Sequence, residues 1–211
     1  MNQSAINTEE PPRPDLVKRG QGLEYFTIAY NSLEGLIAIV AGIIAGSIAL
    51  VGFGFDSVIE VTSGAALLWR LHADMGEERR ECVELLTLRI VGVCFLALAL
   101  YVAYDAVSSL TAHELSERSI PGILLAIASL IVMPLLARRK RKVALGLGSK
   151  AMRADAKQTE FCTYLSAILL GGLLLNAVFG WWWADPLAAL LMVPIITKGG
   201  IEALRGDTCC D

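Results

Sequence analysis

The segment LVGFGFDSVIEVTSGAALLWRL, Leu50 to Leu71, decides the fold class because it places two carboxylates inside an otherwise apolar stretch. Asp56 and Glu60 are four residues apart, so on a helix they lie on one face, one turn from each other. The apolar residues around them favour a membrane-spanning helix, in which a carboxylate normally faces a polar cavity or a partner. The pair therefore predicts a cation-binding position. The alternative is a pair of buried acids that only hydrogen-bond to neighbouring helices.

The composition of the whole chain is typical of a polytopic membrane protein. Of its 211 residues, 55% are hydrophobic and only 18% are charged, and the mean hydropathy is +0.58. Soluble domains carry about 25% charged residues. The five cysteines have no paired spacing, so we expect free thiols and no disulfide framework.

Apolar stretches and their basic flanks predict an all-α membrane protein with six transmembrane helices. Basic residues flank the stretch from Tyr25 to Leu71 at both ends, so it should cross the membrane twice, turning near Gly46 and Ser47. The first four spans are expected at 25–45, 48–69, 85–110 and 119–137. The fifth is expected after Ser149, and the sixth from Asp185, as N-cap, to about Leu204.

The distribution of basic residues predicts the orientation. Of the 18 lysines and arginines, only Arg118 falls in a predicted outer loop, so both termini should face the cytoplasm. The run Arg138 to Lys142 should anchor a cytoplasmic loop at the lipid headgroups, and Trp181 to Trp183 should mark the far interface. We expect residues 1–22 to be a disordered cytoplasmic tail, 23–205 a transporter domain and 206–211 a short cytoplasmic tail.

A second polar pair occurs at helical spacing in the predicted fifth span. The segment ADAKQTEFC, residues 154–162, contains Gln158 and Cys162, again four residues apart. With Asp56 and Glu60 they would supply two carboxylates, an amide oxygen and a thiolate, which suits a tetrahedral divalent ion. Alone the second pair is a weak signal, because intramembrane glutamine and cysteine usually pack or hydrogen-bond.

These two segments resemble motifs of the cation diffusion facilitators, six-helix divalent-metal transporters that work as dimers and commonly exchange metal for protons. FDSVIE, residues 55–60, is similar to the family's second-helix Asp-x-x-x-Asp or His-x-x-x-Asp motif. ADAKQTEFC is similar to its fifth-helix Ala-Asp-x-x-His-x-x-x-Asp motif, and WADP at 183–186 resembles its start of helix six. The resemblance covers about residues 25–204 and places Asp56, Glu60, Gln158 and Cys162 at the four transport-site positions.

The departures from the family pattern concern the identity of the metal. Glutamate, glutamine and cysteine stand at 60, 158 and 162, where the family motif has aspartate, histidine and aspartate. We also expect a short, divergent member that lacks the family's cytoplasmic C-terminal domain. A homodimer would then be held through the transmembrane helices.

Three other polar residues are candidates for supporting roles. Glu34, in the first span, would belong to a proton path or else serve interhelical packing. Cys209 and Cys210 would capture cytosolic metal or else be incidental thiols on a tail.

Together these features predict a secondary transporter and not an enzyme. We expect efflux of a divalent transition metal by proton antiport with alternating access, with zinc as the first candidate and cadmium, cobalt, iron and manganese as the others. No permanently bound cofactor is expected. The alternative is a non-transporting membrane metal sensor or subunit that acts through a partner. The expected surroundings are the lipid bilayer of the cytoplasmic (inner) membrane and a second copy of the chain, with no nucleic acid.

Overall fold

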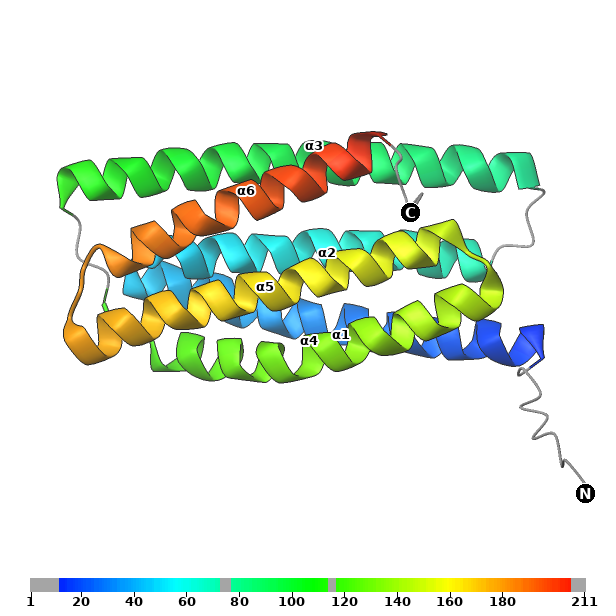
Figure 1. Cartoon of the computed structure of the whole chain (residues 1–211), viewed down its shortest axis with the longest axis horizontal. Helices are drawn as coiled ribbons and strands as arrows, with labels where there is room; N and C mark the ends of the chain where they lie inside the picture. Colours follow the sequence, from blue (N-terminus) through cyan, green and yellow to red (C-terminus); the bar gives the residue numbers. More distant parts are fainter. Residues whose placement is uncertain (1–11, 73–76, 114–116, 206–211) are drawn as a thin grey trace, which may run out of the picture.

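Six long helices run side by side along one axis of the molecule (Figure 1). The computed structural model describes residues 12–72, 77–113 and 117–205. The helices are α1 (Arg13–Ala45), α2 (Ile48–His72), α3 (Glu77–Ala112), α4 (Ile120–Leu147), α5 (Lys150–Phe179) and α6 (Ala184–Arg205). Each contains an apolar stretch long enough to cross a membrane, and the described ranges contain no strand. The predicted six-helix membrane fold is confirmed.

Two helices extend further than hydropathy predicts. Helix α1 begins at Arg13, so residues 13–22, predicted as part of a tail, are helical. Helix α4 continues through the basic run to Leu147, so that run lies in a helix and not in a loop. The two extensions pack on each other. Gly146 of α4 lies so close to the Leu16 side chain of α1 that a Cβ added at Gly146 would be 2.9 Å from it. Hydropathy does not detect this packing between helices, so it underestimates the length of α1 and α4.

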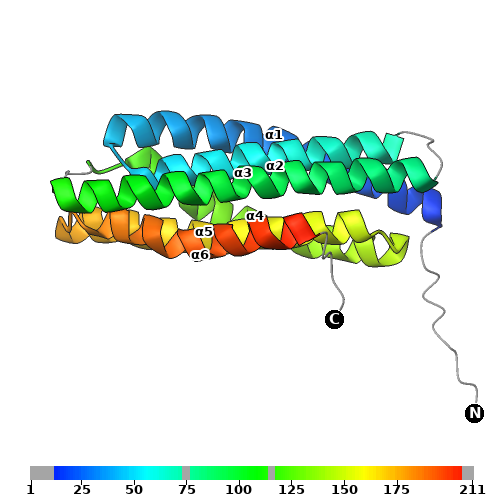
Figure 2. The ribbon, with the colours of Figure 1, turned by 90° about the horizontal axis from the view of Figure 1, so that it is seen from above.

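The helices form two layers. Figure 2 shows α1, α2 and α3 in one layer and α4, α5 and α6 in the other. Helices α1 and α2 approach closely enough that a Cβ added at Gly54 would lie 2.6 Å from the Ile39 side chain. Glycine at such contacts lets helix backbones approach closely inside a membrane. This contact brings the polar face of α1 against the carboxylates of α2.

A left-handed glycine makes the tight turn between α1 and α2. Gly46 has φ 62°, and its N–H and that of Ser47 bond to the last carbonyls of α1. The turn lies where the sequence predicts it.

Asp185 has a different partner from the one that its sequence position suggests. It follows Ala184, the first residue of α6, but its carboxylate accepts hydrogen bonds from Ser47 Oγ at 2.5 Å and Ile48 N at 2.8 Å. Asp185 therefore caps the N-terminus of α2 across the bundle. The expectation of a cap on its own helix is corrected, because tertiary packing brings the free N–H groups of α2 to it.

The two ends of the bundle differ in chemistry. At one end, which we call the basic end, α1, α3 and α5 begin and α2, α4 and α6 end. It carries exposed basic residues, namely Lys18, Arg19, Arg138, Arg139, Arg141, Lys142 and Arg205. At the opposite end the rings of Trp181 and Trp183 stack with their centroids 4.9 Å apart. Basic residues concentrated at one end, and tryptophans at an interface, are each typical of a membrane-spanning bundle.

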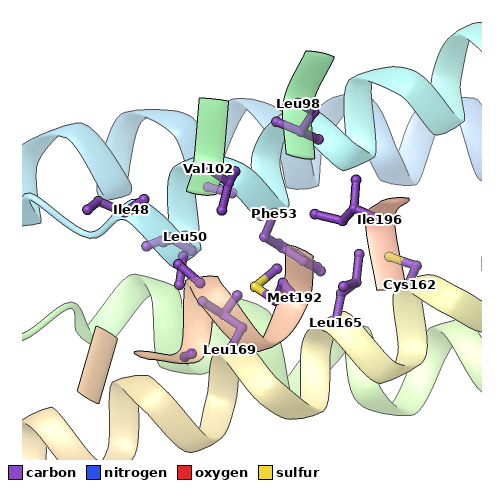
Figure 3. Close-up of a cluster of buried hydrophobic side chains, with 14 of the residues drawn as sticks. Ile48, Leu50, Phe53, Leu98, Val102, Cys162, Leu165, Leu169, Met192 and Ile196 are labelled. Atoms are coloured by element: carbon purple, nitrogen blue, oxygen red, sulfur yellow. The ribbon is translucent and has the colours of Figure 1, made fainter. Parts of the chain in front are cut away.

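An apolar core fills the bundle between the opposite end and Cys162. In Figure 3, Leu50 and Phe53 of α2 approach Leu165 and Leu169 of α5 and Met192 of α6. On the other side of Cys162, toward the basic end, a column of buried polar side chains runs between the helices. This polar column comprises Glu24, Thr27, Asn31, Glu34, Glu60, Lys140, Asp155 and Thr159. A smaller apolar cluster of Leu67, Val143, Ala144 and Met152 lies beyond it, so the column is enclosed at both ends.

Candidate metal site

Asp56 and Glu60 lie on the inward face of α2, where the apolar core meets the polar column. They are 4% and 1% exposed, because α1 and α5 pack against α2. Thr159 of α5 donates to Glu60 Oε1 at 2.6 Å, whereas Glu60 Oε2 has no hydrogen-bond partner among the described residues. The sequence placed both acids on one buried helix face, and the structure agrees.

Cys162 of α5 lies between these two carboxyl groups. Its side chain is 1% exposed, and its thiol interacts with both the Asp56 and the Glu60 carboxyl groups. Ser129 of α4 is close enough to bond to the same thiol. A thiol enclosed by carboxyls from another helix can join α2 to α5 through a shared cation, because thiolate and carboxylate are both metal ligands.

Glu34 of α1 is a further acid at this position. It is buried, accepts a hydrogen bond from Ser57 Oγ at 3.1 Å, and interacts electrostatically with Asp56 and Cys162. Its second oxygen, Oε1, has no hydrogen-bond partner in the described part of the chain. The structure therefore adds a third carboxyl group, from a third helix, to those that the spacing predicts.

Gln158 is the predicted ligand that the structure does not bring into contact with the rest. It lies one helical turn from Cys162 but is only partly buried, and its Nε2 has no hydrogen-bond partner among the described residues. Thr159, the next residue, is fully buried and makes the contact to Glu60. The buried Nε2 leaves the Gln158 amide free to change its rotamer toward the other three side chains.

The chemistry of this cluster suits a cation. Three carboxyls and a thiol, from Glu34, Asp56, Glu60 and Cys162, are buried together, and uncompensated buried charge is costly. In the described ranges, no three acidic, histidine or cysteine side chains already have the arrangement of a metal site. Binding would therefore require these side chains to turn toward a common point.

Several residues of the polar column carried no functional prediction. Glu24, Thr27 and Asn31 are all buried, and their spacing of three and four residues on α1, which continues to the already predicted Glu34, is the signal that would have revealed a polar helix face. Asp155 lies in the quoted fifth-span motif, and Lys140 in the basic run. The predicted capture residues Cys209 and Cys210 lie outside the described residues.

Comparisons with known proteins are consistent with a cation-binding site. The family model described as the cation efflux transmembrane domain matches residues 25–206. An uncharacterized transporter of Methanocaldococcus jannaschii is 29% identical over 181 residues, covering 82% of this chain and 62% of that protein.

Two eukaryotic relatives are similarly distant. Transmembrane protein 163 of Xenopus laevis is 27% identical over 197 residues, covering 89% of this chain and 66% of that protein. Metal tolerance protein 4 of Oryza sativa subsp. japonica is 28% identical over 174 residues, covering 77% and 42%. The chain thus spans less than two thirds of the length of each of these three relatives.

Proposed function

The chain belongs to the cation efflux family, the cation diffusion facilitators, and from this premise we propose that it carries a divalent transition metal out of the cytoplasm. Zinc is the first candidate. The observation that supports the proposal is the contact of a thiol on α5 with two carboxyls on α2, buried midway along the membrane-spanning helices.

The ligand types favour zinc or cadmium over harder ions. Thiolate is a soft ligand that selects zinc-like metals, whereas manganese and magnesium prefer sites made of oxygen alone. Asp56, Glu60 and Cys162 offer both kinds of atom, and the amide oxygen of Gln158 would complete a tetrahedral set by a change of rotamer.

Protons are the proposed counter-ion. A metal binds the deprotonated forms of carboxyl and thiol groups, so metal and protons compete for the same atoms. Glu34 contacts Ser57 beside Asp56, and its Oε1 makes no hydrogen bond to the described residues, so we propose it as the residue that passes protons to and from the site. Alternating access would follow from movement of α2 relative to α5, which separates or joins the two halves of the site.

The variant Asp56→Asn tests this proposal, because it keeps the shape of the side chain and removes its charge. We expect zinc flux into proteoliposomes, followed with an enclosed zinc-sensitive dye, to fall by at least about tenfold, since loss of even an outer-shell partner of a metal ligand costs about 10–100-fold. Thermal stability in detergent should be unchanged or higher, because the cost of burying a charge disappears.

The matched control is Asp105→Asn, on α3 beside Tyr101, for which we expect wild-type flux. Wild-type flux in Asp56→Asn would refute the metal site. Zinc binding without flux in the wild-type protein would instead favour a metal sensor or subunit that acts through a partner.

A further inference from the structure

A buried ionic network joins α1, α4 and α5 on the basic-end side of the candidate metal site. Lys140 Nζ lies 3.1 Å from Glu24 Oε2 and 2.5 Å from Asp155 Oδ2. The side chains of Lys140 and Glu24 are 0% exposed and that of Asp155 is 3% exposed. Two acidic side chains from different helices therefore hold a positive charge in the interior of the bundle.

Lys140 differs from the rest of its basic run. Arg138, Arg139, Arg141 and Lys142 are exposed, as lipid-headgroup anchors should be, whereas Lys140 turns into the bundle. An ammonium group loses much solvation free energy when it is buried, so it is held there by the two acids. The two acids thus already bind a cation, which is the ammonium group of Lys140 in the same chain.

The two acids can bind more positive charge than one ammonium supplies. Glu24 Oε1 and Asp155 Oδ1 are buried and have no hydrogen-bond partner among the described residues. Each carboxylate offers about four lone-pair positions. When both acids are ionised, two carboxylates and one ammonium leave an excess of one negative charge, which a divalent ion in place of the ammonium would neutralise.

The network continues into the candidate metal site. Thr159 Oγ1 contacts the Asp155 carbonyl oxygen at 3.1 Å and donates to Glu60 Oε1 at 2.6 Å. Lys140 also interacts electrostatically with Glu60. Asp155 precedes Cys162 by seven residues on α5, which corresponds to about 10 Å along the helix toward the basic end.

We propose that Glu24 and Asp155 form a second binding position for the transported divalent cation, and that the Lys140 ammonium occupies this position except while an ion passes through it. An ion that comes from the basic end would displace the ammonium, bind both carboxylates and then pass along Thr159 to Asp56, Glu60 and Cys162. Lys140 would return behind it and oppose backflow. The nature of the ion rests on the proposed function.

The competing explanation is a purely structural ion pair. In that case the ammonium is the only cation that the two acids ever hold, and its removal leaves them unpaired without creating a metal site. The two explanations differ in the number of metal ions that a Lys140 variant binds.

The test is the stoichiometry of zinc binding to the full chain in detergent, measured by equilibrium dialysis. All proteins carry Cys209→Ser and Cys210→Ser, so that these two thiols add no bound ion. We expect one zinc ion per chain in this background, two in Lys140→Met, and one again in Lys140→Met with Asp155→Asn. The control Arg139→Met removes an exposed charge from the same run and should bind one.

Two further variants keep the test decisive if Lys140→Met does not fold. Lys140→Gln retains a polar side chain between the acids and should also gain an ion. Glu24→Gln leaves Lys140 and Asp155 as a balanced pair, and we expect its KM for zinc flux to rise at least tenfold with kcat nearly unchanged. A Lys140 variant that folds and binds no additional zinc, or wild-type KM in Glu24→Gln, overturns the second site.

The same measurements separate this inference from the proposed function. Asp56→Asn combined with Lys140→Met should still bind one ion, at Glu24 and Asp155. Background protein that binds no zinc would refute the candidate site at Asp56 and Glu60, whereas one ion in both the background and Lys140→Met would refute only the second position.

Discussion

At the scale of single residues, Cys162 sets the character of the candidate site. The family motif has a carboxylate at this position, and here a buried thiol contacts both Asp56 and Glu60. A thiolate in that place should favour soft ions.

Replacement of Cys162 therefore has two distinct expected outcomes. Cys162→Ala should lower zinc affinity by at least about tenfold, the effect of losing about 1.4 kcal/mol of binding free energy. Cys162→Asp should keep transport and shift preference from cadmium toward manganese, because an oxygen replaces sulfur. Competition between cadmium and manganese for uptake into proteoliposomes measures the shift.

Cys94→Ala is the control, because Cys94 is an exposed thiol on α3. If Cys162 is only a small buried hydrophobe, alanine should be tolerated and aspartate should inactivate the protein. That result would remove Cys162 from the site.

At the scale of elements, α2 depends on a residue that α6 supplies. The first N–H groups of a helix have no partner within it, and Asp185 satisfies that of Ile48 while also binding Ser47. Because α2 carries Asp56 and Glu60, this contact fixes where the site lies along the bundle.

Asp185→Ala should destabilise the protein by about 2 kcal/mol, at the upper end of helix-cap effects because the bonds are buried and charge-assisted. Thermal unfolding in detergent, monitored by circular dichroism, provides the measurement. Asp15→Ala, an exposed acid in the first turn of α1, is the control and should change stability by less than about 1 kcal/mol. Equal unfolding temperatures for the Asp185 and Asp15 variants would contradict a capping role.

At the scale of the whole molecule, one end of the bundle carries most of the exposed basic side chains and the other carries three of the four tryptophans, Trp181 to Trp183. The positive-inside rule predicts that the basic end faces the cytoplasm. Helix α1 begins at that end, and α6 runs toward it (Figure 1).

Cysteine accessibility tests this orientation. On a background without the five native cysteines, a cysteine introduced by His113→Cys should react with a membrane-impermeant maleimide from outside intact cells. One introduced by Arg139→Cys should react only after the cells are opened. Labelling of the His113 variant from the cytoplasmic side alone would refute the orientation.

The sequence by itself determined the number of helices and the inward pairing of Asp56 with Glu60. Both depend on local patterns, since about twenty apolar residues span a bilayer and residues four apart share a helix face. The first turn, at Gly46, was predictable for the same reason.

Only the tertiary structure decided which residue of the basic run Arg138 to Lys142 turns into the bundle. Five consecutive basic residues point in all directions around a helix, and only the packing of α4 against α1 and α5 buries Lys140 between Glu24 and Asp155. The partner of Asp185 and the approach of Glu34 to Asp56 likewise depend on contacts between segments far apart in the chain. Hydropathy and spacing describe one helix at a time, whereas a buried charge is placed by the neighbour that compensates it.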